Sequence, residues 1–273
     1  DTNPFKNCIV MGHVQDKDGK KMSKHVGNTV DPWSVLNTQG ADAVRWFFYN
    51  NAAPWMPNRF HAKAIDETTR KYMGTLWNTY AFFILYAEID QFNPKEHPLD
   101  KAELTLMDRW ILSRLNSLVR EVDDDLNEYK IFEASRAMTD FVDDLSNWYV
   151  RRSRERFWGK GMAGDKEAAF ATLYHVLETM SRLTAPFTPF MAENMYRNLV
   201  CSVDKDAPIS VHMTDFPVCD EAYINAELEQ YSPDLAKRPQ IVAANKVDIM
   251  QDPALLEQLR AYVESQGMEL FEI

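Results

Sequence analysis

Cysteine is scarce in this chain, with three residues among 273: Cys8, Cys201 and Cys219. No two of them form a Cys-x-x-Cys pair, and none lies at ligand spacing from a histidine, so the sequence predicts no zinc or other metal site. Three thiols without a pattern do not make a disulfide framework. They suit a reducing compartment, and we expect a cytoplasmic location.

Long apolar runs and secretory features are also missing. No stretch approaches the roughly 18 consecutive apolar residues that identify a membrane helix. The first residues, Asp-Thr-Asn-Pro-Phe-Lys, have neither the basic nor the apolar region of a signal peptide. The chain does not begin with methionine, which is consistent with an internal start. We therefore expect no membrane partner.

Positive charge is in the minority. The chain has 41 acidic and 30 basic residues, with a formal net charge of −11. This balance argues against a general nucleic-acid binder, which is usually basic. It does not exclude RNA, because a local basic patch can hold phosphates on an acidic protein.

The most informative segment is residues 21–25, Lys-Met-Ser-Lys-His, which lies between Gly19 and Gly27. The glycines permit the φ values of a tight turn. Lysine is a compact charge on a flexible stem, suited to phosphate oxygens that move. Lys21 and Lys24 are therefore candidates for a cationic clamp, and the alternative is a solvated surface loop. We expect the Ser23 hydroxyl to hold the turn through the backbone.

This segment resembles the KMSKS loop of class I aminoacyl-tRNA synthetases. The resemblance implies that the loop closes on ATP, with its Mg²⁺, and stabilises pyrophosphate while the amino acid is adenylated. Lys21 and Lys24 would then be catalytic, with Lys24 on the ATP phosphates. His25 departs from the commonest form of the loop, which has serine there.

Three later segments make the resemblance more specific: residues 40–60, 145–158 and 183–193. Together with the loop they resemble the isoleucyl-tRNA synthetases, from residue 1 to about residue 228. The resemblance implies an isoleucine–tRNA ligase that forms AMP, with ATP, isoleucine and tRNA-Ile as partners, and a monomer. The HIGH motif of that family is not in this chain, so we expect a fragment that is inactive alone.

The last 45 or so residues do not fit that family. Residues 241–249, Ile-Val-Ala-Ala-Asn-Lys-Val-Asp-Ile, resemble the guanine-reading strand and loop of Obg-family GTPases. In such a domain Asn245, Lys246 and Asp248 would contact the guanine base, and here they would be a vestige of that site. None of the nine glycines forms a G-x-x-x-x-G-K-[ST] phosphate loop, so GTP binding is not expected. Two other functions stay open: a truncated GTPase fusion, and a non-catalytic tRNA-binding module.

The pattern along the chain predicts a mainly α protein in three parts. Residues 1–65 are a remnant of a Rossmann-like catalytic domain, with a strand at 7–12. Residues 66–228 form an anticodon-binding helical bundle, and 229–273 a β-α-β unit whose strands would be neighbours only with further strands present. One expected helix begins at Asp31-Pro32. Further helices are expected at 41–48, 68–88, 105–126, 131–158, 165–183 with Asp165 as cap, and 190–199. An extended stretch is expected at 210–215, and the tail is expected to contain strands at 240–244 and 268–273 with a helix at 252–265 between them.

The densest positive cluster is Arg151, Arg152, Arg154 and Arg156, with Lys160 close behind. These arginines are candidates for tRNA phosphates. Ion pairs with Asp143, Asp144 and Glu155 have about equal weight, because a helix spreads the arginines over several faces. Trp148 and Trp158 could stack on anticodon bases, but their spacing favours the core.

Overall fold

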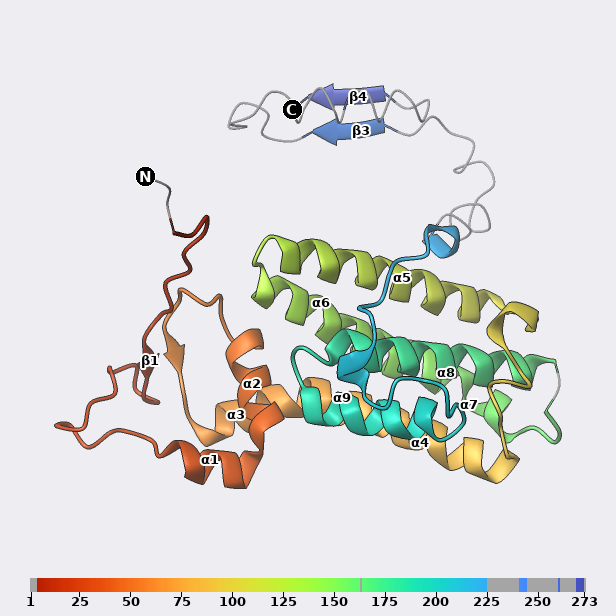
Figure 1. The fold of residues 1–273 in the computed structure, drawn as a ribbon, viewed down its shortest axis with the longest axis horizontal. Coiled ribbons are helices and arrows are strands. Elements are labelled where there is room, and N and C mark those ends of the chain that lie inside the picture. Colours follow the sequence, from red (N-terminus) through yellow and green to blue (C-terminus); the bar gives the residue numbers. More distant parts are fainter. Residues whose placement is uncertain (1–3, 163, 225–240, 245–259, 261–268, 273) are drawn as a thin grey trace. The chain divides into compact units, whose positions relative to one another are not determined.

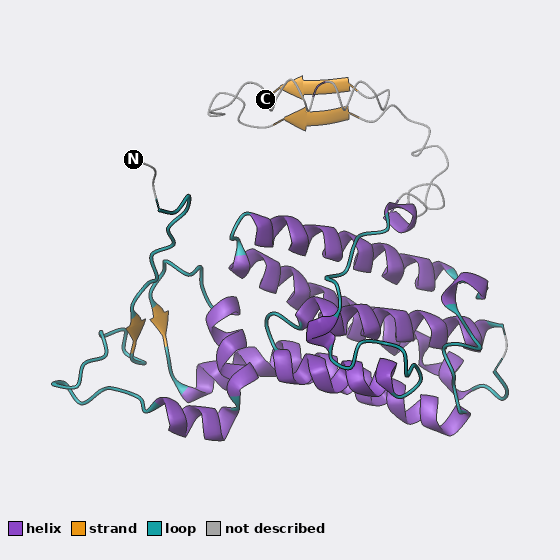
Figure 2. Cartoon of the chain, viewed as in Figure 1, coloured by secondary structure: helices purple, strands orange, loops and turns teal. Residues whose placement is uncertain are grey.

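The computed structural model describes residues 4–162, 164–224, 241–244, 260 and 269–272 (Figure 1). The chain divides into two compact units, residues 1–224 and residues 225–273. The first unit is mainly helical, as Figure 2 shows, which confirms the predicted fold class. Among the described residues, no helix has the length and apolar character needed to cross a membrane.

The first 60 residues form two short helices and a small sheet. Helix α1 (Pro32–Gln39) begins as predicted, because the Asp31 carboxylate accepts a hydrogen bond from Ser34 N at 3.0 Å and proline occupies the first turn. Helix α2 (Ala41–Asn50) follows it. Strand β1 (Val14–Gln15) pairs in parallel with β2 (Asn58–Arg59).

The strand predicted at residues 7–12 is wrong. Strand β1 begins at Val14, two residues beyond the end of the predicted strand, and residues 7–12 are an irregular connection. Gly12 explains the difference, because its N–H donates to Pro54 O at 2.8 Å and a Cβ there would lie 2.1 Å from Met56 O. The chain crosses another backbone at this point, and no strand partner lies alongside.

The bundle consists of long helices, three of which contain a short π-helical turn. The first runs through α3 (Ala62–Thr69), η1 (Arg70–Gly74) and α4 (Thr75–Asp90). After η2 (Leu99–Lys101), the others are α5 (Leu106–Asn127); α6 (Ile131–Asp143) with η3 (Asp144–Val150) and α7 (Arg151–Trp158); α8 (Asp165–Thr184); and α9 (Pro189–Tyr196) with η4 (Arg197–Cys201).

Helix α8 lies against α4, α5, α7 and α9, and most of its residues are buried (Figure 1). Its first turn differs from the prediction. Gly164, with φ of +56°, is the N-cap, and Asp165 is the first helical residue. The Asp165 carboxylate lies 2.7 Å from Arg156 Nε, so it binds a guanidinium and does not cap the helix.

The extended stretch predicted at residues 210–215 is a 3₁₀ turn, η5 (Val211–Met213). The Glu193 carboxylate accepts hydrogen bonds from Ser210 Oγ at 2.8 Å and Val211 N at 2.9 Å. These bonds hold the segment to α9, where no strand is available to pair with it.

In the second unit, β3 (Ile241–Ala244) and β4 (Glu269–Glu272) pair in parallel, with Ile241 opposite Glu269. The two predicted strands are therefore present. They are direct neighbours without any intervening strand, contrary to the expectation that further strands would be needed. The helix predicted at 252–265 lies outside the described residues except for Arg260, which is helical.

Candidate functional site

The lysine-rich segment is a hairpin held at its base. Asp16 N donates to Lys20 O at 2.9 Å, and Gln15 and Lys21 form an antiparallel bridge. The turn is closed by Gly19, whose φ of +80° is accessible to glycine at little cost. The Asp16 carboxylate accepts from the N–H groups of Asp18 at 3.0 Å and Lys20 at 2.9 Å.

Asn28 fixes the second half of the segment. Its amide nitrogen donates to Asp16 Oδ2 at 2.8 Å and to Lys21 O at 3.3 Å, and its Oδ1 accepts from Ser23 N at 2.8 Å. The hydrogen bond from Asn28 is the main reason why the pKa of Asp16 lies below its usual value. Neither residue was among the predicted site residues, although an Asp and an Asn on either side of a glycine turn were a usable signal.

Lys21 and Lys24, just before and within the turn at residues 23–27, are exposed to solvent. The Ser23 hydroxyl accepts from His25 N at 3.2 Å, which confirms its predicted structural role. Lys21 and Lys24 are exposed, and within the described part of the chain neither ammonium has a hydrogen-bond or ion-pair partner. Both charges are therefore available to an anionic ligand.

A hollow of about 590 Å³ lies beside this segment. The loop contributes Asp16, Met22 and Asn28 to its wall, and Phe60 and His61 lie on the other side. Its volume would admit a ligand of the size of a nucleotide, and Lys21 and Lys24 lie outside its lining.

The four predicted arginines are not equivalent. Arg151, Arg152 and Arg154 are exposed, whereas the side chain of Arg156 is 13% exposed. The Arg152 guanidinium lies 4.4 Å from the centre of the Trp148 ring, and that of Arg154 lies 5.9 Å from the Phe82 ring. Three of the four thus remain accessible to a large anionic partner.

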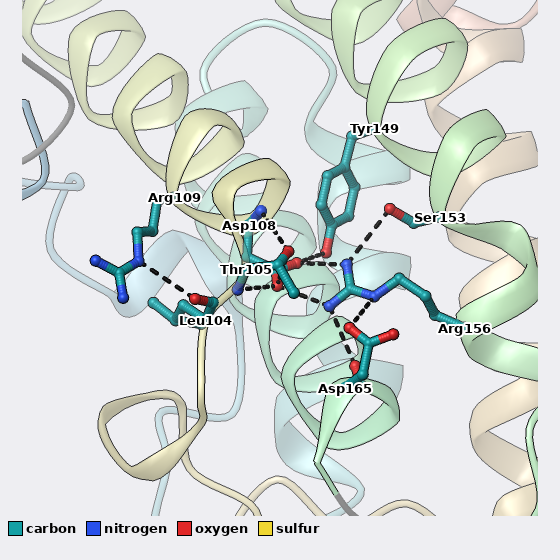
Figure 3. Close-up of polar contacts among 8 residues, drawn as sticks. All are labelled: Leu104, Thr105, Asp108, Arg109, Tyr149, Ser153, Arg156 and Asp165. Atoms are coloured by element: carbon teal, nitrogen blue, oxygen red, sulfur yellow. Dashed lines mark hydrogen bonds and ion pairs between the residues drawn. The ribbon is translucent and has the colours of Figure 1, made fainter. Parts of the chain in front are cut away.

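Arg156 belongs to a buried network (Figure 3). Its Nη1 and Nη2 donate to the two carboxylate oxygens of Asp108 at 2.8 and 2.7 Å, and Asp108 is fully buried. Tyr149 OH donates to Asp108 Oδ1 at 2.6 Å, and Thr105 Oγ1 donates to Oδ2 at 2.7 Å. Arg156 is thus held by carboxylates, and we remove it from the candidate phosphate contacts.

The partners of the arginines also differ from those considered on the sequence. Asp144 pairs with Arg114 at 2.9 Å, and Asp143 accepts from Asn147 at 2.6 Å. Among the described residues, no ion pair joins Asp143, Asp144 or Glu155 to the arginine cluster.

The expectation that Trp148 and Trp158 lie in the core is wrong, because their side chains are 49% and 56% exposed. The position buried beside Trp148 is Tyr149. From Met138 and Leu145, a period of 3.6 residues per turn predicts buried positions at 149, 152 and 156. Tyr149 is buried there, whereas the next buried residues are Ser153 and Phe157, each one position later. The π turn η3 accommodates the one extra residue.

Asn245, Lys246 and Asp248 lie outside the described residues; β3 ends at Ala244, immediately before them. Across the part of the chain that the structure describes, there is no group of three or more His, Cys, Asp or Glu side chains arranged to hold a metal ion.

Two family models match the chain. Residues 108–256 match the anticodon-binding domain of tRNA ligases, and residues 1–56 match the class I tRNA synthetases of the I, L, M and V type. The chain therefore belongs to the family of class I tRNA ligases that carry this anticodon-binding domain. The first match runs past residue 228 to include positions 245, 246 and 248.

The curated relatives are more specific. The chain is 54% identical over 230 residues to the isoleucine–tRNA ligase of Clostridium tetani and 55% identical over 229 residues to that of Clostridium novyi, in each case 84% of this chain. The isoleucine–tRNA ligase of Dehalococcoides mccartyi is 51% identical over 225 residues. The chain spans 22% of the length of each of these proteins. The recognition of an isoleucyl-tRNA synthetase segment is confirmed, and neither the family models nor these relatives support the GTPase interpretation.

Solved structures agree on the fold. LeuRS of Agrobacterium radiobacter, in a ternary complex with tRNA and LeuAMS, matches 94% of this chain and 29% of its own, with a TM-score of 0.59 and 18% identity. Methionyl-tRNA synthetase of Mycobacterium tuberculosis, in complex with methionyl-adenylate, matches 76% of this chain and 43% of its own, with a TM-score of 0.55 and 19% identity.

Proposed function

We propose that this chain is the part of an isoleucine–tRNA ligase that supplies the mobile lysines for adenylation and the helical surface for tRNA-Ile. The observation that carries the proposal is the loop of residues 16–28: a braced hairpin with two unpaired lysines. It lies in a segment matched by the class I synthetase family. On the same grounds we place the protein in the cytoplasm as a monomer.

The chemistry requires positive charge that can follow a leaving group. In adenylation, an oxygen of the isoleucine carboxylate bonds to the α-phosphorus of ATP, and pyrophosphate leaves with the electrons of the broken P–O bond. ATP brings Mg²⁺ with it. Lys24 would meet the charge that grows on the leaving group, with Lys21 beside it, and such interactions accelerate the step when they are strongest in the transition state. This chain has no residues matched to the HIGH motif, so we expect no adenylation by the chain alone.

The loop is tested best in a complete enzyme. The segment of the Clostridium tetani enzyme that aligns with this chain would be exchanged for this sequence, and Lys24→Ala would be compared with the parent by isoleucine-dependent pyrophosphate exchange. Removing one group that stabilises the transition state lowers such rates by about 100-fold, while the dissociation constant of isoleucine stays unchanged. Lys63→Ala, an exposed lysine on α3, is the matched control. A Lys24→Ala rate within twofold of the parent would contradict the role.

The tRNA surface is tested on the chain itself. We expect the full chain to bind an isoleucine tRNA transcript weakly, with an affinity that falls steeply with salt. Replacing Arg151, Arg152 and Arg154 by Gln should reduce the salt slope by about 0.7–0.9 for each phosphate that is no longer neutralised. Arg120→Gln, in an exposed pair with Glu221, is the control. An unchanged salt slope in the triple variant would show that none of the three arginines contacts a phosphate.

A labelled-GTP filter assay on the same chain separates this proposal from the GTPase alternative. Because no phosphate loop is present in the sequence, we expect no retention at micromolar GTP. Retention at that concentration would favour the GTPase alternative for the second unit.

A further inference from the structure

We propose that Trp148 and Arg152 form a preformed platform on which an unpaired RNA base stacks. The proposal rests on the proposed tRNA-binding function and adds the kind of nucleotide, unpaired rather than helical, that the surface takes. It concerns the exposed side of the long helix formed by α6, η3 and α7.

The platform is visible in the contacts of two side chains. The Arg152 guanidinium lies over the Trp148 ring at 4.4 Å from its centre, close enough for a cation–π interaction. Trp148 nevertheless remains 49% exposed as a residue beside this contact. A hollow of about 470 Å³ adjoins the pair and is lined by Asn147, Trp148, Arg151 and Arg152. Two flat groups are thus already held together at the edge of an open space.

The fold places this tryptophan outside at a cost. Exposed indole surface is unfavourable in water, yet Trp148 is 49% exposed within the π turn η3 while the next residue, Tyr149, is fully buried. Such single-turn insertions are frequent at functional sites.

The charge around the platform selects the occupant. Within the described residues, neither Arg151 nor Arg152 is ion-paired, so two guanidinium groups beside the indole lack a counter-charge. A nucleotide supplies both missing components, a flat base for the indole and a phosphate for the arginines. An acidic peptide would supply the negative charge but no flat ring to stack on the indole. Bases inside a duplex already stack on each other, so the base must be unpaired.

The test compares Trp148→Ala with the parent in the full chain, using an isoleucine tRNA transcript over a range of salt concentrations. We expect about tenfold weaker binding at every salt concentration, since stacking on one aromatic ring has that magnitude. The salt slope should stay the same, because no charge is removed. Trp148→Phe should recover binding to within about threefold. Arg152→Lys keeps the charge but loses the planar guanidinium, and should weaken binding about threefold.

Two further measurements make the outcome unambiguous. Trp33→Ala removes another exposed tryptophan, on α1, and should leave tRNA affinity unchanged. A fully paired RNA duplex should bind Trp148→Ala and the parent equally well, whereas single-stranded oligouridylate should distinguish them. If the parent binds no tRNA, the proposed function and the platform both fail. If the parent binds and Trp148→Ala binds equally well, the platform alone is overturned.

Discussion

Asp108 and Arg156 lie 48 positions apart in the sequence and form a bidentate ion pair between the start of α5 and the end of α7. Their N–O distances are 2.8 and 2.7 Å, and the carboxylate is fully buried. A buried charge depends on its partner far more than an exposed one does. This pair therefore matters more to the stability of the bundle than any of the exposed ion pairs.

We expect Asp108→Asn to lower the free energy of unfolding by about 3 kcal/mol, because it removes the buried carboxylate from Arg156 and leaves that guanidinium only the exposed Asp165 as a counter-charge. Asp144→Asn is the matched control. It breaks an ion pair to Arg114, whose side chain is 45% exposed, and should change stability by less than about 1 kcal/mol. Urea unfolding followed by circular dichroism measures both, and equal losses would show that burial does not set the value of the Asp108 pair.

The Asp108 carboxylate also predicts part of the dependence of folding stability on acid pH. Burial raises the pKa of Asp108, but hydrogen bonds from Arg156, Tyr149 and Thr105 outweigh it and hold the pKa below its usual value. Since the unfolded pKa is about 3.9, the stabilisation is complete above about pH 4 and is lost as pH falls through the folded pKa. The stability difference between the parent and Asp108→Asn should therefore narrow on acidification.

Asp42 should show the opposite trend. Burial raises the pKa of Asp42 although Met191 N and Phe190 N donate to its carboxylate. A raised folded pKa gives a contribution that is present below the unfolded value and lost as pH rises through the folded value. The stability of the parent relative to Asp42→Asn should increase on acidification. Urea unfolding of the three proteins at several pH values checks the two signs, and parallel curves would contradict both.

The sequence predicted features that depend on neighbouring residues. The start of α1 at Asp31-Pro32 and the turn around Ser23 are such local features. The Asp108–Arg156 pair could not be predicted, because nothing local relates two residues 48 positions apart. The inward and outward faces of α7 were misplaced for a different reason: a fixed period of 3.6 cannot represent one extra residue in a π turn.

That extra residue predicts an unusual tolerance to deletion. Removing Asn147 should convert η3 to regular α-helix and keep Ser153 and Phe157 in the core, because their positions then follow the period set by Met138. We expect the deletion variant to fold cooperatively. Removing Ala137, in the regular part of α6, would instead rotate everything after it by about 100° and should abolish cooperative unfolding. Thermal unfolding of the two variants decides, and equal damage would contradict the one-residue explanation.

The hydrogen bonds of Asn28 predict how the lysine loop is held. Asn28→Ala removes the donor to Asp16 and Lys21 and the acceptor for Ser23 N, so three hydrogen bonds that hold the loop are lost together. In the complete enzyme that carries this segment, we expect the rate of pyrophosphate exchange to fall about tenfold with unchanged isoleucine affinity. The reason is that the loop no longer holds Lys21 and Lys24 in position. In this chain, hydrogen exchange at Ser23 N–H should be faster. Unchanged exchange at that amide would show that the loop is held by other contacts.

His25 should be replaceable, although it stands where the commonest form of the loop has serine. Its contact to the turn is the backbone N–H, which donates to Ser23 Oγ at 3.2 Å, and its side chain is exposed. Serine supplies the same N–H. In the complete enzyme that carries this segment, His25→Ser should therefore leave the rate of pyrophosphate exchange within twofold of the parent. Ser23→Ala removes the acceptor itself and should slow the reaction several-fold. A large effect of His25→Ser together with none of Ser23→Ala would mean that the imidazole, and not the turn, contacts the phosphates.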